Sequence, residues 1–144
     1  MPSEDHAVPF GKAAIRQRGS ELTLVTWGAS VHACVEACRD LEGQVTVIDL
    51  RTIMPWDREA VMTSVRETGR LLVVHEDTLT CGFGAEIVAT VAANCFSCLK
   101  MAPQRLATTD CPIPYNANLA LSLVPDAKKI GDRIIKLLKT DPVE

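Results

Sequence analysis

The sequence predicts a three-layer α/β/α sandwich built around a mostly parallel sheet. Apolar stretches rich in β-branched residues alternate along the chain with stretches of helical periodicity. Strands that are apolar nearly throughout are typical of sheets covered by helices on both faces, and strands that alternate with helices pair in parallel. The predicted strands span residues 22–27, 45–50, 71–76 and a stretch near 104–109.

Capping and turn residues mark the first elements. Residues 12–19 alternate weakly and end in glycine, which favours a short edge strand whose charged side chains discourage further pairing. Ser30 is a candidate N-cap for a helix that ends at Gly43. Asp57 is a candidate N-cap for a second helix that ends at Gly69.

Two further helices are expected in the second half of the chain. An apolar helix is predicted over 85–99, and a final amphipathic helix over 126–140. Between them, residues 110–125 contain several prolines and are expected to be irregular, a composition that also suits contacts with a neighbouring molecule. The apolar face of the final helix carries Ile130, Ile134, Leu137 and Leu138.

Composition excludes several classes of protein. A chain of 144 residues has the size of one domain. Its formal charge of -3, with scattered Lys and Arg, offers no basic surface for nucleic acid. No apolar run approaches the roughly 20 residues needed to cross a bilayer. We therefore expect neither nucleic acid nor a membrane as a partner.

The cysteines and the N-terminal residues favour an intracellular protein. No signal-peptide core is present, and cysteines lie within apolar helical patterns, so reduced thiols are expected. Cys34 with Cys38, and Cys95 with Cys98, have helical spacing but no histidine at ligand spacing, which favours buried thiols over a zinc site. Residues 1–11 are interpreted as a linker and 12–144 as the domain.

The stretch "HEDTLTCGFGAE" has the most reactive groups. Adjacent acids could raise the pKa of His75 and make it a possible catalytic proton carrier, or the imidazole could simply be hydrogen-bonded locally at the end of a strand. Cys81 is a nucleophile only if a base lies beside it. Gly82 and Gly84 precede a helix and could receive a phosphate, or could instead allow a tight turn and close packing. Glu86 stabilises the positive end of that helix.

Residues 49–55 are assigned a structural role. Asp49 and Arg51 flank one residue at the end of a strand, so their side chains fall on one face and could pair. Pro55 lies in the segment "TIMP", which turns the chain. No residues in this chain are assigned to a cofactor or a metal.

Four stretches together resemble one family. They are "VPFGKAAIRQRGSELTLVTWGASVH", "VTVIDLRTIMPWD", "VRETGRLLVVHEDTLTCGFGAEI" and "APQRLATTDCPIPY". In order and spacing they resemble the C-terminal domain of the beta subunit of thiamine-diphosphate-dependent 2-oxo acid dehydrogenases, within the transketolase C-terminal domain family. "VIDLRTIMPWD" and "VTWG" favour the branched-chain (2-oxoisovalerate) type over the pyruvate type. Cys81 departs from the resemblance, because family members often carry glycine there.

The resemblance implies a five-stranded sheet with an antiparallel edge strand and a role in assembly. It implies that thiamine diphosphate and magnesium are bound by domains outside this chain, and that the parent reaction is oxidative decarboxylation of a branched 2-oxo acid with acyl transfer to lipoyl-lysine. The implied partners are a second copy, the alpha subunit, an upstream pyrimidine-binding domain and the acyltransferase subunit-binding domain, in a bacterial cytoplasm or mitochondrial matrix. The interface residues expected are His75, Glu76, Gly82, Phe83, Gly84 and Glu86.

Three alternatives remain open at this stage. The first is the same domain of a pyruvate dehydrogenase beta subunit. The second is a free-standing enzyme that uses His75 and Cys81. The third is a small nucleotide-binding module.

Overall fold

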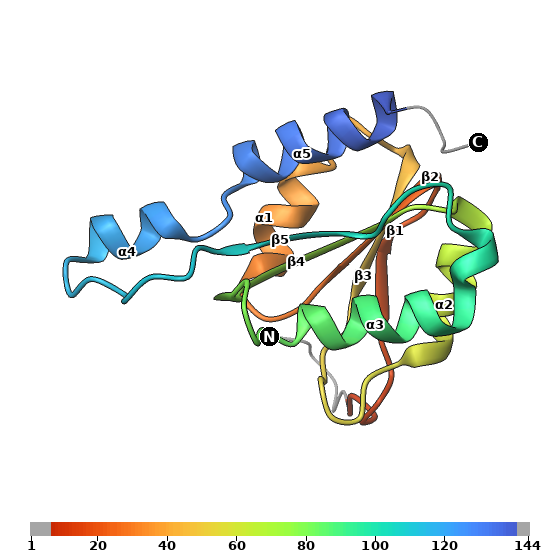
Figure 1. Cartoon of the computed structure of the whole chain (residues 1–144), viewed down its shortest axis with the longest axis horizontal. Helices are drawn as coiled ribbons and strands as arrows, with labels where there is room; N and C mark the ends of the chain where they lie inside the picture. The colour runs from red at the N-terminus through yellow and green to blue at the C-terminus, as the bar shows by residue number, and fades with distance from the viewer. Residues whose placement is uncertain (1–6, 141–144) are drawn as a thin grey trace.

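A five-stranded sheet forms the middle layer of the computed structural model, which describes residues 7–140 (Figure 1). The strand order is β1-β3-β2-β4-β5; β1 pairs with β3 in antiparallel fashion, and the other pairs are parallel. The predicted sheet and its antiparallel edge strand are therefore confirmed. The strands are β1 (Ala14–Gln17), β2 (Gly19–Thr26), β3 (Gly43–Asp49), β4 (Leu71–Thr78) and β5 (Gln104–Thr108).

Helices cover both faces of the sheet. On one face α1 (Ser30–Ala37) and α5 (Ala127–Lys139) pack side by side, and α2 (Arg58–Thr68) and α3 (Gly84–Cys95) pack on the other (Figure 1). A short 3-10 helix (Phe96–Cys98) follows α3, and α4 (Ala117–Leu123) lies away from the sheet. None of the helices within residues 7–140 is long and apolar enough to span a membrane.

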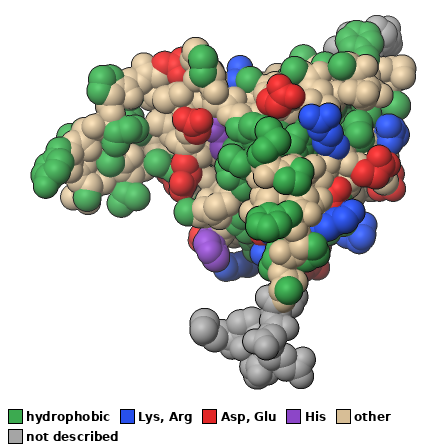
Figure 2. Space-filling model, turned by 90° about the horizontal axis from the view of Figure 1, so that it is seen from below, with side chains coloured by type: hydrophobic (Ala, Val, Ile, Leu, Met, Phe, Trp, Pro, Cys, Tyr) green, Lys and Arg blue, Asp and Glu red, His purple; other side chains and the backbone are tan. Residues whose placement is uncertain are grey.

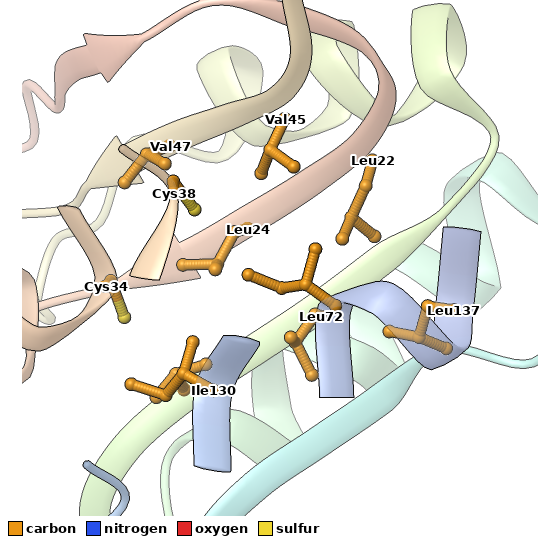
Figure 3. Close-up of a cluster of buried hydrophobic side chains, with 11 residues drawn as sticks. Leu22, Leu24, Cys34, Cys38, Val45, Val47, Leu72, Ile130 and Leu137 are labelled. Carbon is orange, nitrogen blue, oxygen red and sulfur yellow. The ribbon is translucent and has the colours of Figure 1, made fainter. Parts of the chain in front are cut away.

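Two apolar cores lie on the two faces of the sheet. Figure 3 shows one of them, in which Leu22, Leu24 and Leu72 of the sheet cluster with Cys34 of α1 and Ile130 of α5. Alternate residues of the same strands face the second core, as expected for the two-residue period of a strand. That core contains Val25, Ile48 and Val73 with Val61 of α2 and Ile87 of α3.

The cysteines of the first core are inert structural residues. Burial raises the pKa of both Cys34 and Cys38 to about 12, so neither thiol ionises appreciably near neutral pH. They fill space beside Ile130 and Ile134 as small apolar side chains. The interpretation of Cys34, Cys38 and Cys95 as buried free thiols is confirmed, whereas Cys98 is only half-buried.

The second helix begins and ends where the sequence predicts. The Asp57 side chain accepts a hydrogen bond from the Ala60 N–H, and Gly69 ends the helix in a left-handed conformation with φ 73°. Both signals are local, because one side chain caps the N-terminus and one backbone conformation closes the C-terminus. Local chemistry is enough to place α2.

Two predictions about helices are wrong. Ser30 is the first helical residue and makes no capping hydrogen bond, and α1 ends at Ala37 instead of Gly43, which begins β3 with φ 79°. The segment 110–125 is not entirely irregular, because it contains α4. Asn116 caps α4 by accepting hydrogen bonds from the N–H groups of Asn118 and Leu119.

Candidate functional site

Aromatic side chains fill the crevice at the carboxyl ends of the central strands. Trp27 follows β2, Trp56 precedes α2, and Phe83 precedes α3. The His75 ring of β4 stacks on Trp27 with ring centroids 5.2 Å apart, Trp27 meets Phe83 edge-on at 5.7 Å, and Phe83 meets Trp56 edge-on at 6.4 Å. Open parallel sheets bind ligands at this position. Here four rings of the chain itself lie where β2 and β4 are neighbours. We call them the aromatic row: His75, Trp27, Phe83 and Trp56.

His75 is a buried, neutral member of this aromatic row. It has no exposed surface, and neither ring nitrogen has a hydrogen-bond partner among the described residues. Burial lowers the pKa of His75, and this effect outweighs the opposing influence of Asp77. The expectation that adjacent acids raise this pKa is therefore wrong, because removal from water dominates. The ring stacks on Trp27.

The two glycines make room for the His75 ring. A Cβ added to Gly84 would lie 2.5 Å from His75 Nε2 and 2.7 Å from Cδ2, and one added to Gly82 would lie 2.6 Å from Cε1. Real Cβ atoms do not approach other atoms this closely. The Gly-x-Gly pattern thus allows the N-terminus of α3 to pack closely against β4. This agrees with the interpretation of the motif as a turn for close packing.

The α3 N-terminus does not fit a phosphate or a diphosphate. The N–H groups of Ala85, Glu86 and Ile87 already donate to carbonyl groups of Gly82 and Phe83, at 2.9, 3.0 and 3.3 Å. The exposed carboxylate of Glu86 in the first turn would repel an anion. Within residues 7–140, no group of three or more His, Cys, Asp or Glu side chains is placed to hold a metal ion. The described residues of this chain therefore do not fit thiamine diphosphate or magnesium.

The expected interface residues divide into covered and exposed ones. His75, Gly82 and Gly84 are buried within the chain, so their role here is internal packing. Glu76 and Glu86 are exposed, and Phe83 is half-buried. Only these last three offer surface to a second molecule.

Cys81 and His75 do not form a nucleophile and base pair. Cys81 is exposed and has a left-handed backbone (φ 62°), whereas the His75 ring is buried and contacts Gly82 and Gly84. The pair of groups that a thiol mechanism requires is not brought together.

The Asp49 side chain contacts Arg16 of the edge strand and the main chain of Arg51. Its carboxylate accepts from Arg16 Nη2 of the edge strand at 2.6 Å and from the Arg51 backbone N–H at 3.1 Å. Arg51 has φ 59° and an exposed side chain, so Asp49 holds its main chain and not its guanidinium. The predicted pairing of the Asp49 and Arg51 side chains is wrong, because β1 pairs with β3 and places the Arg16 guanidinium beside the Asp49 carboxylate.

Pro55 lies in a loop that is joined to the start of the described chain. It follows a cis peptide bond, and its carbonyl accepts from the Thr52 hydroxyl at 2.7 Å. That hydroxyl in turn accepts from the Gly11 N–H at 2.9 Å, which ties the last residue of the predicted linker to the loop. Residues 1–6 of the predicted linker lie outside the described residues, and 7–10 are exposed.

The sequence did not predict an exposed apolar arm, residues 109–125, which leaves the sheet after β5 and carries α4 (Figure 1). No residue of α4 is buried. Figure 2 shows hydrophobic side chains along this arm and across the underside of the body. The large exposed side chains of the arm are Ile113 (62% exposed), Tyr115 (108%), Leu119 (57%) and Leu121 (70%).

Both ends of the arm are fastened to the body. The Asp110 carboxylate accepts from the N–H and the hydroxyl of Thr80, at 2.9 and 2.6 Å. At the other end, Lys129 Nζ donates to the carbonyls of Ser122 and Val124, at 2.6 and 3.2 Å. The apolar side chains are thus held out from the body by polar contacts at the base of the arm. The signal that could have found α4 is Asn116 before the run "ANLALSL".

Comparison with known proteins assigns the family. The model of "Transketolase, C-terminal domain" matches residues 11–130. The chain belongs to this family. A solved split-gene transketolase, described as an inactive beta4 tetramer, superposes with a TM-score of 0.80 at 20% identity, covering 95% of this chain and 45% of that one.

Curated relatives are longer proteins. This domain is 44% identical over 117 residues to the 2-oxoisovalerate dehydrogenase subunit beta 2 of Arabidopsis thaliana, covering 79% of the chain and 33% of that protein. It is 37% identical over 142 residues to the pyruvate dehydrogenase E1 component subunit beta of Mycoplasma genitalium, covering 96% of the chain and 43% of that protein. The chain therefore spans between a third and a half of the relatives that it matches.

Proposed function

We propose that this chain is the C-terminal assembly and dimerisation domain of the beta subunit of a 2-oxo acid dehydrogenase. The observation that carries the proposal is the apolar arm, whose large side chains Ile113, Tyr115, Leu119 and Leu121 are exposed. The beta-subunit names of the Arabidopsis and Mycoplasma relatives support the kind of enzyme. The higher identity to the plant protein supports the branched-chain type over the pyruvate type.

The arm provides enough apolar surface for association. Full burial of a large aliphatic or aromatic side chain contributes roughly 1.5–3 kcal/mol. The arm exposes four such side chains, Ile113, Tyr115, Leu119 and Leu121. Exposed apolar patches of this kind on a soluble protein mark contact surfaces. The cost of leaving them in water is removed if a partner covers them.

A second contact region lies beside the aromatic row. Glu76 follows the buried part of β4, Glu86 lies in the first turn of α3, and the half-buried Phe83 lies between them in the chain. His75, Gly82 and Gly84 position this region from within, because the glycines let α3 approach the ring. We infer that Glu76, Phe83 and Glu86 contact a second molecule.

For the whole protein we propose the following role, which membership of the family supports. The parent reaction is oxidative decarboxylation of a branched-chain 2-oxo acid with acyl transfer to lipoyl-lysine. Thiamine diphosphate and magnesium are held by an upstream pyrimidine-binding domain and the alpha subunit. The further partner is the subunit-binding domain of the acyltransferase, and the location is the bacterial cytoplasm or the mitochondrial matrix. Residues 12–144 constitute the assembly domain, and the preceding eleven residues link it to what lies upstream.

Self-association of the chain is the direct test. Analytical ultracentrifugation of the wild type over a wide concentration range should show a dimer. The double variant Leu119→Ser/Leu121→Ser should weaken the dimer by roughly 100-fold, because loss of about 3 kcal/mol of apolar burial corresponds to that ratio. Ile135→Ser, on the exposed side of α5 at 44% exposure, is the matched control and should leave the dimer unchanged.

A wild type that stays monomeric at the highest concentration reached would contradict the dimerisation role. Equal weakening by Ile135→Ser would show that the arm has no special part. Co-expression of the full-length beta subunit with alpha subunits of the 2-oxoisovalerate and the pyruvate enzymes separates the two subtypes. Stable assembly with the pyruvate alpha subunit alone would favour the alternative.

A further inference from the structure

Two exposed cysteines follow neighbouring strands at equal spacing. Cys81 comes three residues after the end of β4, and Cys111 comes three residues after the end of β5. Both thiols are exposed. Strands β4 and β5 are parallel neighbours in the sheet. The two cysteines therefore leave the same edge of the sheet from adjacent positions.

The contacts between the two segments continue up to the cysteines. Thr78 is the register partner of Thr108, and the Leu79 N–H donates to the Thr108 carbonyl at 3.0 Å. Thr80 then donates its N–H and its hydroxyl to the Asp110 carboxylate, at 2.9 and 2.6 Å. These contacts join 78 to 108 and 80 to 110, so Cys81 and Cys111 are the next residues of the two segments.

The two segments are joined at Thr80 and Asp110, the residues immediately before the two cysteines. The Cα atoms of disulfide-bonded cysteines are about 4.4–6.8 Å apart. We propose that Cys81 and Cys111 form a reversible intramolecular disulfide, which fastens the base of the arm to the turn after β4.

The bond forms by thiol–disulfide exchange with a small disulfide such as oxidised glutathione. The thiolate of one cysteine attacks a glutathione sulfur, and one glutathione thiolate leaves. The second cysteine attacks the mixed disulfide at the protein sulfur, and the second glutathione thiolate leaves. Two protein thiols are oxidised, one glutathione disulfide is reduced to two thiols, and the two protons pass to solvent or to the departing thiolates.

The other cysteines compete poorly for the oxidant. Cys34, Cys38 and Cys95 are buried, and burial raises the pKa of Cys34 and Cys38 to about 12. The thiolate is the attacking species, so these residues react slowly. Cys98 is half-buried after α3 and serves as the natural control.

The disulfide would replace a polar surface contact by a covalent one at the start of the arm. Without it, the side-chain contacts between the two segments are those of Asp110 with Thr80 and of Arg105 Nη1 with the Leu79 carbonyl, the latter at 2.6 Å. Ile113 and Tyr115 lie two and four residues beyond Cys111, so the bond would fix the direction in which they leave the sheet. An effect on assembly rests on the proposed function, whereas formation of the bond does not.

Mass spectrometry of the reduced chain after exposure to oxidised glutathione is the test. The chain is then denatured and its free thiols are alkylated. Two cysteines are expected to escape alkylation, and before alkylation the oxidised monomer should be lighter than the reduced one by the mass of two hydrogen atoms. Proteolysis should yield one linked pair of peptides that contain Cys81 and Cys111, and dithiothreitol should separate them. Cys81→Ser and Cys111→Ser should each abolish the linked peptide and retain one glutathione adduct instead, whereas Cys98→Ser should leave it unchanged.

Several results would overturn the proposal. Stable glutathione adducts on both cysteines of the wild type would mean that the thiols do not reach each other. A covalent dimer on a non-reducing gel would mean that they pair between chains. Sedimentation of the oxidised and reduced wild type is measured separately, so a failure of assembly does not obscure the result on the bond.

Discussion

Gly84→Ala tests whether the glycine pattern exists to accommodate His75. The added Cβ would lie 2.5 Å from His75 Nε2, 2.7 Å from its Cδ2 and 3.3 Å from Val73 Cγ1. The ring is buried and stacked on Trp27, so it cannot move aside without losing that contact. Overpacking of a core costs roughly 1–3 kcal/mol. Alanine at a helical position recovers up to about 1 kcal/mol relative to glycine.

The net expectation is a loss of about 1–2 kcal/mol in the free energy of unfolding. For a domain of this size that corresponds to a drop in Tm of roughly 3–8 °C. Urea unfolding followed by circular dichroism measures the change. Gly131→Ala is the matched control, because Gly131 is also helical, but an added Cβ there meets nothing within 4 Å. It should be neutral or stabilising by up to about 1 kcal/mol.

A double-mutant cycle identifies the clash. In a His75→Ala background the ring is gone, and Gly84→Ala should then cost less than about 0.5 kcal/mol, since contacting residues couple and independent ones add. If Gly84→Ala is as stable as the wild type, or costs the same with and without the ring, the close approach of α3 to His75 is not the reason for the glycine.

Two further outcomes follow from the contacts described. Asp49→Asn should cost about 1–2 kcal/mol in urea unfolding, because Asp49 is buried and its charged hydrogen bond to Arg16 is lost. Arg66→Gln removes an exposed ion pair, in which Arg66 Nη1 lies 3.9 Å from Glu59 Oε1, and should cost under about 0.5 kcal/mol. If the two variants lose equal free energy of unfolding, the Asp49 contact does not contribute as described. Burial lowers the pKa of His75 from 6.5, so below that pH the unfolded state takes up the proton first. Stability should be complete above pH 6.5 and should fall as the pH drops toward the lowered pKa of the folded state; His75→Phe should remove this part of the slope, and identical slopes would exclude His75 as its source.

The sequence predicts elements whose signals are local. Asp57 and Gly69 bound α2 correctly, because a cap and a left-handed residue act within one helical turn. The prediction of Ser30 as an N-cap was wrong, because β2 leads into α1 through Gly28 and Ala29 without a capping hydrogen bond. The sequence did not predict helix α4, because its apolar residues do not pack in a core and their spacing therefore does not indicate a buried face.

Contacts between residues far apart in the sequence could not be predicted from local sequence patterns. Trp27 lies 48 positions before His75, and nothing in the stretch "HEDTLTCGFGAE" indicates that an indole covers the imidazole. Arg16 likewise reaches Asp49 only because β1 pairs antiparallel with β3. In both cases topology decides the partner. Reasoning from neighbours in the sequence therefore chose Glu76 and Asp77 for His75, and Arg51 for Asp49.

Residues 75–86 and the arm serve two separate purposes. The ring of His75, with Gly82 and Gly84, determines how close α3 comes to β4, and disturbing it should change stability. Leu119 and Leu121 are exposed, so disturbing them should change association and leave the folding of the single chain intact. If Gly84→Ala weakened the dimer at concentrations where the chain is fully folded, the aromatic row would itself shape the interface through Phe83. If it did not, the arm alone would account for assembly, and the two measurements together decide which surface holds the partner.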